Sequence, residues 1–528
     1  MPTKGYLSIL LHAHLPWVRH PEHDDFLEED WLFEAITETY LPLLAMMDGL
    51  QRDGVPWQLT MTLTPPLVSM FNDDLLRARY SRWIARRVEL AEKEIKRTEN
   101  EPTFQWLARM YQAHFAECRQ AFDKTYDRDL TGAFRRLQDA GGLEIMTCGA
   151  THGFLPLLQP WPRAVRAQIR VAAQHYRENF GRDPRGIWLP ECGYFVGVDE
   201  MLAAENIRYF IVDTHGIMNA TPRPSAGVYA PIFCPSGVAA FGRDTETSHQ
   251  VWSKDAGYPG DFAYREFYRD VGFDLDWYYV RPYIQPTGER KMTGIKYYRI
   301  TGKTNHKEPY DPELARKRAD EHASNFMFNR ERQIEHLAGV MGGQPPIITA
   351  PYDAELFGHW WFEGPQFLNY FIRKAAYDQK TFQLISPSEY LTRHPTHQLA
   401  TPSPSSWGAK GFNEVWLDQT NDWLYPHVHA ATARMLELTD RYPSAEGLPL
   451  RALNQAAREL LLAQSSDWAF IMKTKTSVDY ACVRAKEHLI AFANLYEQLV
   501  AGEINFAYLL SLEGRDNIFP HLDYRVFR

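Results

Sequence analysis

Short apolar runs alternate with helical patterns from the N-terminus to about residue 400. Each run is a few residues long and ends at proline, glycine or a charged residue, which is typical of strands buried in a parallel sheet. We predict strands at 6–11, 57–63, 143–148, 186–189, 209–212, 238–241 and 346–350, with a last one at 384–386. Between them, apolar residues three or four positions apart predict helices at 163–180, 198–205 and 312–337. Strands and helices that alternate in this way predict an α/β fold.

Two regions depart from this alternation. From about residue 74 to 140, charged and apolar residues recur at helical spacing, which predicts a helical insertion. After a linker rich in proline and serine, the same spacing predicts helices at 427–441, 448–464 and 478–502. We therefore predict an α/β domain at 1–400, interrupted by the insertion at 74–140, and a C-terminal helical domain at 401–528.

Composition and charge narrow the possible functions. Of the 528 residues, 45% are hydrophobic and 23% are charged, as in ordinary globular proteins. The net charge of −9, without any basic block, argues against nucleic acid as a partner. The five cysteines are scattered and form neither a disulfide framework nor a metal-binding motif. No apolar run reaches the roughly 18 residues of a membrane span, and no signal-peptide pattern precedes the first strand, so we expect a cytoplasmic protein.

Two acidic residues follow predicted strands directly. Glu191 comes after the strand at 186–189, and Asp353 comes after the strand at 346–350. In an α/β barrel this is the rim where catalytic residues lie. Cleavage of a glycosidic bond requires two such carboxyl groups, one ionised and one protonated. A helix-capping role is the structural alternative for Glu191, and two acids among 66 are a weak signal by themselves.

Four histidines also follow predicted strands, namely His12, His14, His152 and His215. Together with Asp213 and Asp353 they could bind a metal ion, as in a metal-dependent deacetylase or mannosidase. Neutral imidazoles could instead form hydrogen bonds with sugar hydroxyls. Any one of them could be an ordinary structural histidine, but we do not expect that of all four at one rim.

Several motifs, in order along the chain, resemble those of glycoside hydrolase family 57. They are HAHLP at 12–16, GATHG at 149–153, WLPECGY at 188–194 and APYDAELFGHW at 350–360. Trp407, Asn413, Trp416 and QSSDW at 464–468 resemble the C-terminal motif of the 1,4-α-glucan branching enzymes in that family. The resemblance spans nearly the whole chain. It implies an incomplete TIM-like (β/α)7 barrel, with a helical insertion and a C-terminal helical domain that completes the active-site cleft.

The resemblance also implies roles for single residues. Glu191 would be the nucleophile and Asp353 the general acid/base of a retaining mechanism that needs no metal or other cofactor. The implied substrate-binding residues are His12, His14, His152, Asp213, Arg265, Trp277, Trp407, Trp416 and Asp467. Core packing is the alternative for each tryptophan, and an internal ion pair is the alternative for Arg265 and Asp467. Cys192 follows Glu191, but the family pattern gives it no nucleophilic role.

The implied function is branching of an α-1,4-glucan, with transfer of the cleaved chain to a 6-hydroxyl. α-Amylases and 4-α-glucanotransferases of the same family share the barrel motifs, so a predominantly hydrolytic enzyme or a glucanotransferase is an alternative. A metal-dependent polysaccharide deacetylase-like enzyme is an alternative of another class. The presence of both candidate acids disfavours a non-catalytic glucan-binding protein.

The branching prediction depends on the C-terminal motif and on an irregular, aromatic-rich stretch at 246–307. In branching enzymes of the family a mobile loop with a tyrosine covers the cleft, and here the loop after Asp213 offers Tyr229. We expect amylose, amylopectin or glycogen as the partner, with neither nucleic acid nor membrane, and a monomer or a small homo-oligomer.

Overall fold

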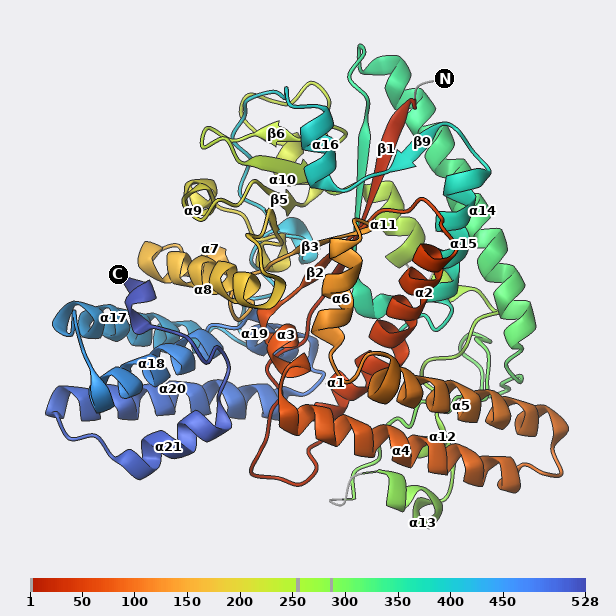
Figure 1. The fold of residues 1–528 in the computed structure, drawn as a ribbon, viewed down its shortest axis with the longest axis horizontal. Helices are drawn as coiled ribbons and strands as arrows, with labels where there is room; N and C mark the ends of the chain where they lie inside the picture. Colours follow the sequence, from red (N-terminus) through yellow and green to blue (C-terminus); the bar gives the residue numbers. More distant parts are fainter. Residues whose placement is uncertain (1–2, 253–256, 285–287) are drawn as a thin grey trace.

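The computed structural model describes residues 3–252, 257–284 and 288–528 (Figure 1). Parallel strands form its centre, which confirms the predicted fold class. They are β1 (Gly5–Ala13), β2 (Leu59–Leu63), β3 (Leu143–Met146), β4 (Gly186–Ile187), β5 (Tyr209–Val212), β7 (Ala239–Gly242) and β8 (Ile347–Asp353). The last predicted strand begins two residues earlier than expected, as β9 (Phe382–Leu384), and a short β6 (Ile232–Phe233) was not predicted.

The strands form two sheets that meet along two seams. One sheet has the order β3-β2-β1-β8, with β9 also paired to β1, and the other has the order β4-β5-β7-β6. Single parallel bridges, Thr147 with Ile187 and Arg243 with Thr349, join β3 to β4 and β7 to β8. The seven parallel strands are therefore an incomplete barrel in which each seam is reduced to one bridge.

The barrel interior is filled by side chains from both sheets. Tyr6 and Leu10 of β1 pack in one buried cluster with Trp188, Tyr209 and Phe241. Residues between them, such as Leu7 and Ile9, pack into the larger core outside the barrel. This alternation follows from the period of two along a strand, which sends successive side chains to opposite faces.

Helices surround this barrel (Figure 1). The predicted helices at 163–180, 198–205 and 312–337 are α8 (Pro162–Phe180), α9 (Val198–Ala204) and α14 (Pro312–Val340). Further helices in the barrel part are α1 (Glu29–Ala35), α2 (Leu41–Arg52), α3 (Pro65–Phe71), α7 (Leu155–Leu158), α10 (Thr214–Met218), α15 (Gly364–Tyr377) and α16 (Pro387–Arg393).

Residues 74–140 are helical, as the spacing predicts. They form α4 (Asp74–Arg97), α5 (Pro102–Gln120) and α6 (Leu130–Asp139), of which α4 and α5 lie side by side (Figure 1). The aromatic-rich stretch at 246–307 contains α12 (Val271–Asp274) and α13 (Trp277–Val280) and most of α11 (Thr245–Trp252), while residues 253–256 and 285–287 lie outside the described residues.

The end of the chain is a bundle of helices beside the barrel (Figure 1). It contains α17 (Leu424–Arg441), α18 (Gly447–Ala463), α19 (Ser466–Thr474), α20 (Val478–Ala501) and α21 (Phe506–Arg515). The short α19 begins where the bundle touches the carboxyl end of the barrel, because the backbone N–H of Ser466 donates to the carbonyl of His152 over 3.0 Å. No helix in the described parts of the chain is long and apolar enough to cross a membrane.

Candidate active site

Glu191 lies in a tight turn just after β4. The backbones of Glu191 and Cys192 are left-handed, with φ of +62° and +52°. Residues other than glycine rarely adopt this conformation, which costs about 1–3 kcal/mol and occurs often at active sites. Backbone hydrogen bonds hold the turn, including one of 2.9 Å from the N–H of Trp407 to the carbonyl of Glu191. Burial raises the pKa of the Cys192 thiol well above its usual value, so it stays protonated beside this turn.

The carboxylate of Glu191 receives two hydrogen bonds from beyond the barrel strands. The indole Nε1 of Trp407 donates to Oε2 over 2.8 Å. The hydroxyl of Ser466, the first residue of α19, donates to Oε1 over 3.2 Å. Burial raises the pKa of Glu191 to about 7, while these two donors oppose the rise because they bind the ionised form more strongly.

Asp353, the last residue of β8, has a different environment. It lies directly beside His12 in the register of β1 and β8. Burial, followed by the negative charges of Glu355 and Glu191, raises its pKa well above the usual value, against the opposing charge of Arg243. Among the described residues, no donor forms a hydrogen bond with its carboxylate. The rim therefore pairs a carboxyl group whose ionised form accepts two hydrogen bonds with one that has no such donor and a more strongly raised tendency to keep its proton, the difference required between nucleophile and general acid.

Three of the predicted histidines stack beside Glu191. The rings of His14 and His152 are 3.8 Å apart between centroids, and Nε2 of His12 is 3.2 Å from Nε2 of His152. The ring of His12 also stacks on Trp188, with centroids 4.7 Å apart. Burial lowers the pKa of His12 and of His152 well below the usual value, so both rings are neutral and can donate or accept hydrogen bonds.

His14 forms a buried ion pair with Asp467. Its Nε2 is 3.0 Å from Oδ1 of Asp467, and its Nδ1 is 3.0 Å from the hydroxyl of Thr64. Burial lowers the pKa of His14, but the charge and hydrogen bond of Asp467 outweigh this and raise it. Burial likewise opposes the ionisation of Asp467, but His14 dominates and its pKa falls to about 2. The ion-pair alternative thus describes Asp467, which lies at the start of α19 within the same cluster.

Asp213 and His215 lie next to the loop that carries Trp407. The two oxygens of Asp213 are 3.3 Å from a terminal nitrogen of Arg243 and 3.4 Å from Nδ1 of His215. Nε2 of His215 is 2.7 Å from the carbonyl of Gly411, in the loop that carries Trp407. The guanidinium of Arg243 also lies over the Trp407 ring, 5.5 Å from its centroid. This network holds the loop that supplies a donor to Glu191.

Trp416 belongs to the packing behind that loop. Its ring is 1% exposed and stacks on Phe154, with centroids 4.3 Å apart. A side chain at Gly408 would meet the Trp416 ring at 2.7 Å, so glycine allows the loop to pack closely. A sugar cannot stack on a ring this buried, so the structure favours the core-packing alternative for Trp416.

Arg265 and Trp277 lie outside this cluster. Arg265 is 5% exposed and forms a 3.0 Å ion pair with Glu38, the internal-pair alternative considered for it. Trp277 begins α13, which lies near the helical insertion (Figure 1). Its half-buried ring faces Arg290. For both residues, no contact in the described ranges reaches the histidines or the two acids.

Tyr229 does not cover the rim. Its carbonyl accepts a 2.9 Å hydrogen bond from the N–H of Ile347, the first residue of β8. It thus lies toward the end of the barrel opposite Asp353. The expected cleft-covering tyrosine is therefore not this residue.

Sequence reasoning missed several residues of the site. Ser466 lies within the QSSDW motif, and Arg243 follows the strand predicted at 238–241, so position after a strand could have indicated the arginine. Glu355 accepts a 3.2 Å hydrogen bond from the N–H of His14 and another from the hydroxyl of Tyr40; it lies in the motif at 350–360, two residues after Asp353, so its position after a strand could also have indicated it.

The histidine cluster also has the donor set of a metal site. One ligand atom each of His14, His152 and Asp467 lies within 4.8 Å of the others. Imidazole and carboxylate suit zinc. Nδ1 of His152, however, is already 2.8 Å from the hydroxyl of Ser466, and Nε2 of His14 is bonded to Asp467. The cluster as it stands is a connected hydrogen-bond network, and a metal would have to displace part of it.

Comparisons with known proteins bear on this site. Residues 8–402 match the profile of glycosyl hydrolase family 57, and residues 427–527 match that of the 1,4-alpha-glucan branching enzyme C-terminal region. A 1,4-alpha-glucan branching enzyme of Thermococcus kodakarensis is 34% identical over 98% of this chain and 77% of its own.

Two solved structures are similar over nearly their whole length. The crystal structure of the α-amylase AmyC from Thermotoga maritima has a TM-score of 0.93 at 48% identity, covering 99% of both chains. That of a family 57 branching enzyme from Pyrococcus horikoshii has a TM-score of 0.88 at 33% identity, covering 99% of this chain and 97% of its own.

Proposed function

The chain belongs to glycoside hydrolase family 57, and on this premise we propose that it is a 1,4-α-glucan branching enzyme with Glu191 as nucleophile and Asp353 as general acid/base. The observation that carries the proposal is the contrast between the two acids. Trp407 and Ser466 stabilise a negative charge on Glu191, whereas burial and neighbouring carboxylates keep a proton on Asp353. A retaining glycosidase needs this division of protonation states before the first step.

In the first step, an oxygen of ionised Glu191 attacks the anomeric carbon of an α-1,4-linked glucose. Asp353 gives its proton to the glycosidic oxygen, so the C1–O4 bond breaks and the leaving chain departs with a new 4-hydroxyl. A covalent glycosyl-enzyme ester on Glu191 remains, with inverted anomeric configuration.

In the second step, the 6-hydroxyl of another glucan chain attacks the same carbon. Ionised Asp353 takes the proton of that hydroxyl, the ester bond to Glu191 breaks, and the α configuration is restored. The product is an α-1,6 branch. If water attacks instead, the product is a new reducing end.

The neutral His12 and His152 stack next to Glu191 and suit hydrogen bonding to sugar hydroxyls, as donors or acceptors. We propose that they bind the sugar that is cleaved. Charged His14 and Asp467, which are bonded to each other, would hold these rings and α19 in place. Asp213 would act beside them, through Arg243 and the loop of Trp407.

The match to the branching-enzyme C-terminal profile supports branching, because that region contributes Ser466 and Asp467, the first two residues of α19. Hydrolysis is the second candidate, because the 48% identical AmyC is named an α-amylase. Branching and hydrolysis differ in what attacks the glycosyl-enzyme intermediate. Branching requires that the site exclude water, so that the 6-hydroxyl of a second glucan chain attacks instead.

The test is proton NMR of linear amylose incubated with the protein, together with a reducing-end assay and the E191Q variant as a blank. A growing α-1,6 anomeric signal with few new reducing ends supports branching. Abundant reducing ends without that signal would instead establish an amylase. A changed distribution of α-1,4 chain lengths without either would indicate a 4-α-glucanotransferase.

A further inference from the structure

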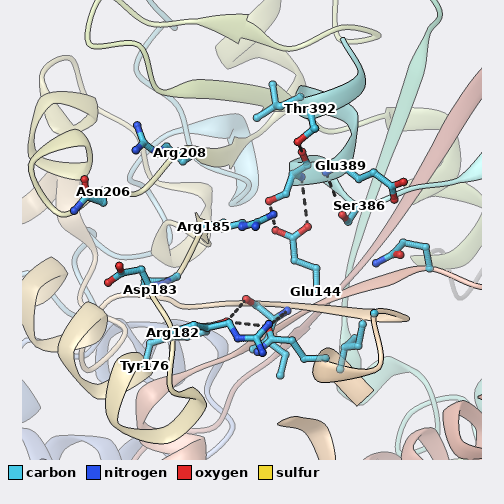
Figure 2. A pocket seen from close by; sticks show the side chains of 18 of the residues that line it. Glu144, Tyr176, Arg182, Asp183, Arg185, Asn206, Arg208, Ser386, Glu389 and Thr392 are labelled. Atoms are coloured by element: carbon cyan, nitrogen blue, oxygen red, sulfur yellow. Dashed lines mark hydrogen bonds between the residues drawn. The ribbon is translucent and has the colours of Figure 1, made fainter. Parts of the chain in front are cut away.

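A cavity of about 920 Å³ opens at the end of the barrel opposite the two acids. It lies where several strands begin, whereas Glu191 and Asp353 lie where strands end. Its wall comes from the starts of β2 to β5 and β7 and from α16, and it includes Gln58, Leu143, Arg185, Arg208, Gly237 and Ser388. A volume of this size suits a small molecule. Figure 2 shows its polar side chains gathered around one space.

The carboxylates of this wall already have protein partners. Glu144 of β3 accepts hydrogen bonds from the hydroxyls of Tyr209, over 2.8 Å, and of Ser388. The other acids are paired within their own segments, Asp183 with Arg177 and Glu389 with Arg393. Arg182 of the wall also has a partner, because it forms an ion pair with Asp139. Asp183 and Glu389 are therefore neutralised by arginines, while Glu144 is held by neutral hydroxyl donors.

Two arginines of the wall, Arg185 and Arg208, have no acidic partner among the described residues. The N–H of Arg208 donates to the carbonyl of Arg185 over 2.7 Å, and the residues that follow them, Gly186 and Tyr209, are paired in the register of β4 and β5. Neither guanidinium has a hydrogen bond or an ion pair within residues 3–252, 257–284 and 288–528. Both side chains are exposed to the cavity's solvent (Figure 2).

Gln138 adds a buried donor to the same wall. The residue is 8% exposed, and its Oε1 accepts hydrogen bonds from the N–H of Ile145 and the hydroxyl of Tyr176. That orientation fixes Nε2 as the free end, and in the described structure Nε2 is buried without a partner. Native proteins rarely leave such a group unpaired unless water or a ligand accepts from it.

From these groups we propose that the cavity binds a small phosphate-bearing anion. Among the described residues, the charged groups of the wall without a hydrogen-bond or ion-pair partner are the guanidinium groups of Arg185 and Arg208. Planar guanidinium groups suit phosphate oxygens. The hydroxyl and amide groups around them, including Asn206 and Thr392, suit the hydroxyls of a sugar phosphate. The glucan itself is neutral and would leave both arginine charges unpaired. The proposal is therefore independent of whether the enzyme branches or hydrolyses glucan.

Isothermal titration calorimetry and thermal unfolding test it at constant ionic strength. The probes are inorganic phosphate, glucose 1-phosphate and neutral maltotriose. We expect one saturable site for a phosphate-bearing probe, with a melting temperature that rises with its concentration. R185S and R208S should each weaken it by about tenfold or more, because each removes a charged hydrogen-bond donor. Both positions are exposed, so the variants should fold.

R109S is the matched control, because Arg109 is an exposed arginine on α5 for which the described residues offer no ion-pair partner either. It should bind the probe as the wild type does. Tighter binding of glucose 1-phosphate than of inorganic phosphate would identify a phosphate ester as the ligand. Tighter binding of inorganic phosphate would identify free phosphate, and equal binding of the two would show that the site recognises the phosphate group alone. Absence of saturable binding, equal loss in R109S and R185S, or equal binding of maltotriose would overturn the proposal.

Discussion

The two ends of the barrel treat charged side chains in opposite ways. At the carboxyl end, Glu191 and Asp467 are enclosed and bonded to residues far away in the chain, and their pKa values are shifted in opposite directions. At the amino end, the acids form ion pairs or accept hydrogen bonds from hydroxyls, and Arg185 and Arg208 are exposed, with no partner among the residues described.

The difference separates reaction from binding. Only where water is excluded can neighbouring groups move a pKa far enough to make one carboxyl group an acid and another a nucleophile. An open, solvated wall cannot do this, but its unpaired charges can still attract an oppositely charged ligand. The same strands form both ends of the barrel, so the difference in solvent access comes from the segments that cover each end. The loop with Trp407 and helix α19 cover only the carboxyl end.

Removing either acid should abolish catalysis at the carboxyl end of the barrel. We expect E191Q and D353N each to lose about 10⁴-fold or more in kcat, because nucleophile and general acid act in every turnover. The measurement is initial rate on amylose, with circular dichroism to verify folding. E99Q, an exposed substitution on the helical insertion, is the control. An active E191Q would exclude Glu191 as nucleophile.

Removing one hydrogen-bond donor to Glu191 should lower the catalytic activity without abolishing it. W407F keeps the ring but loses the N–H that binds Oε2, and we expect kcat/KM to fall by about 10- to 100-fold. Loss of a donor to the ionised form raises the pKa of Glu191 further above its value of about 7, so the acid limb of the pH profile should move to higher pH.

W416F is the matched control for that experiment, because the Nε1 of Trp416 is buried without a hydrogen-bond partner in the described residues. It should leave the acid limb where it is. An equal displacement of the limb in both variants would show that ring packing, rather than the hydrogen bond, sets the pKa of Glu191.

Arg243 offers a finer test of the same end. R243M removes the positive charge that opposes the rise in the pKa of Asp353, so the alkaline limb should move to higher pH. It also releases Asp213 and the face of Trp407, and we expect kcat to fall about tenfold. R243K keeps the positive charge, so its alkaline limb should lie closer to that of the wild type than the alkaline limb of R243M does. A loss of rate without any change in the pH profile would assign Arg243 a purely structural role.

The thermal stability of the protein should reveal that the buried, ionised form of Asp353 is destabilising. A carboxyl group whose folded pKa is raised stabilises the fold at low pH and loses that contribution as the pH rises through the folded pKa. Asparagine does not ionise, so D353N should unfold at a higher temperature than the wild type at pH 8, with a smaller gain at pH 5. Melting curves at both pH values measure this. A gain independent of pH would contradict the raised pKa.

The smallest expected effect is that of a chelator. His14, His152 and Asp467 could bind zinc, but the proposed mechanism requires no metal, so activity should be unchanged after dialysis against EDTA. A loss of activity that zinc restores would favour the metal-dependent alternative.

The sequence by itself determined the fold class and much of the site. Apolar runs bounded by turn residues located the parallel strands, because a buried strand must be apolar on both faces. The position just after a strand selected Glu191, Asp353 and the histidines, because parallel strands present their carboxyl ends at one rim. Both kinds of signal are local in the chain.

The tertiary structure decided what each candidate does. His14 and Asp467 are 453 positions apart, and only the docking of the helical bundle makes them an ion pair. The same docking gives Glu191 its Ser466 donor, while packing removes Trp416 from the cleft and places Arg265 against Glu38. Local patterns cannot specify these outcomes, because burial, pairing and pKa depend on which distant segments meet in space.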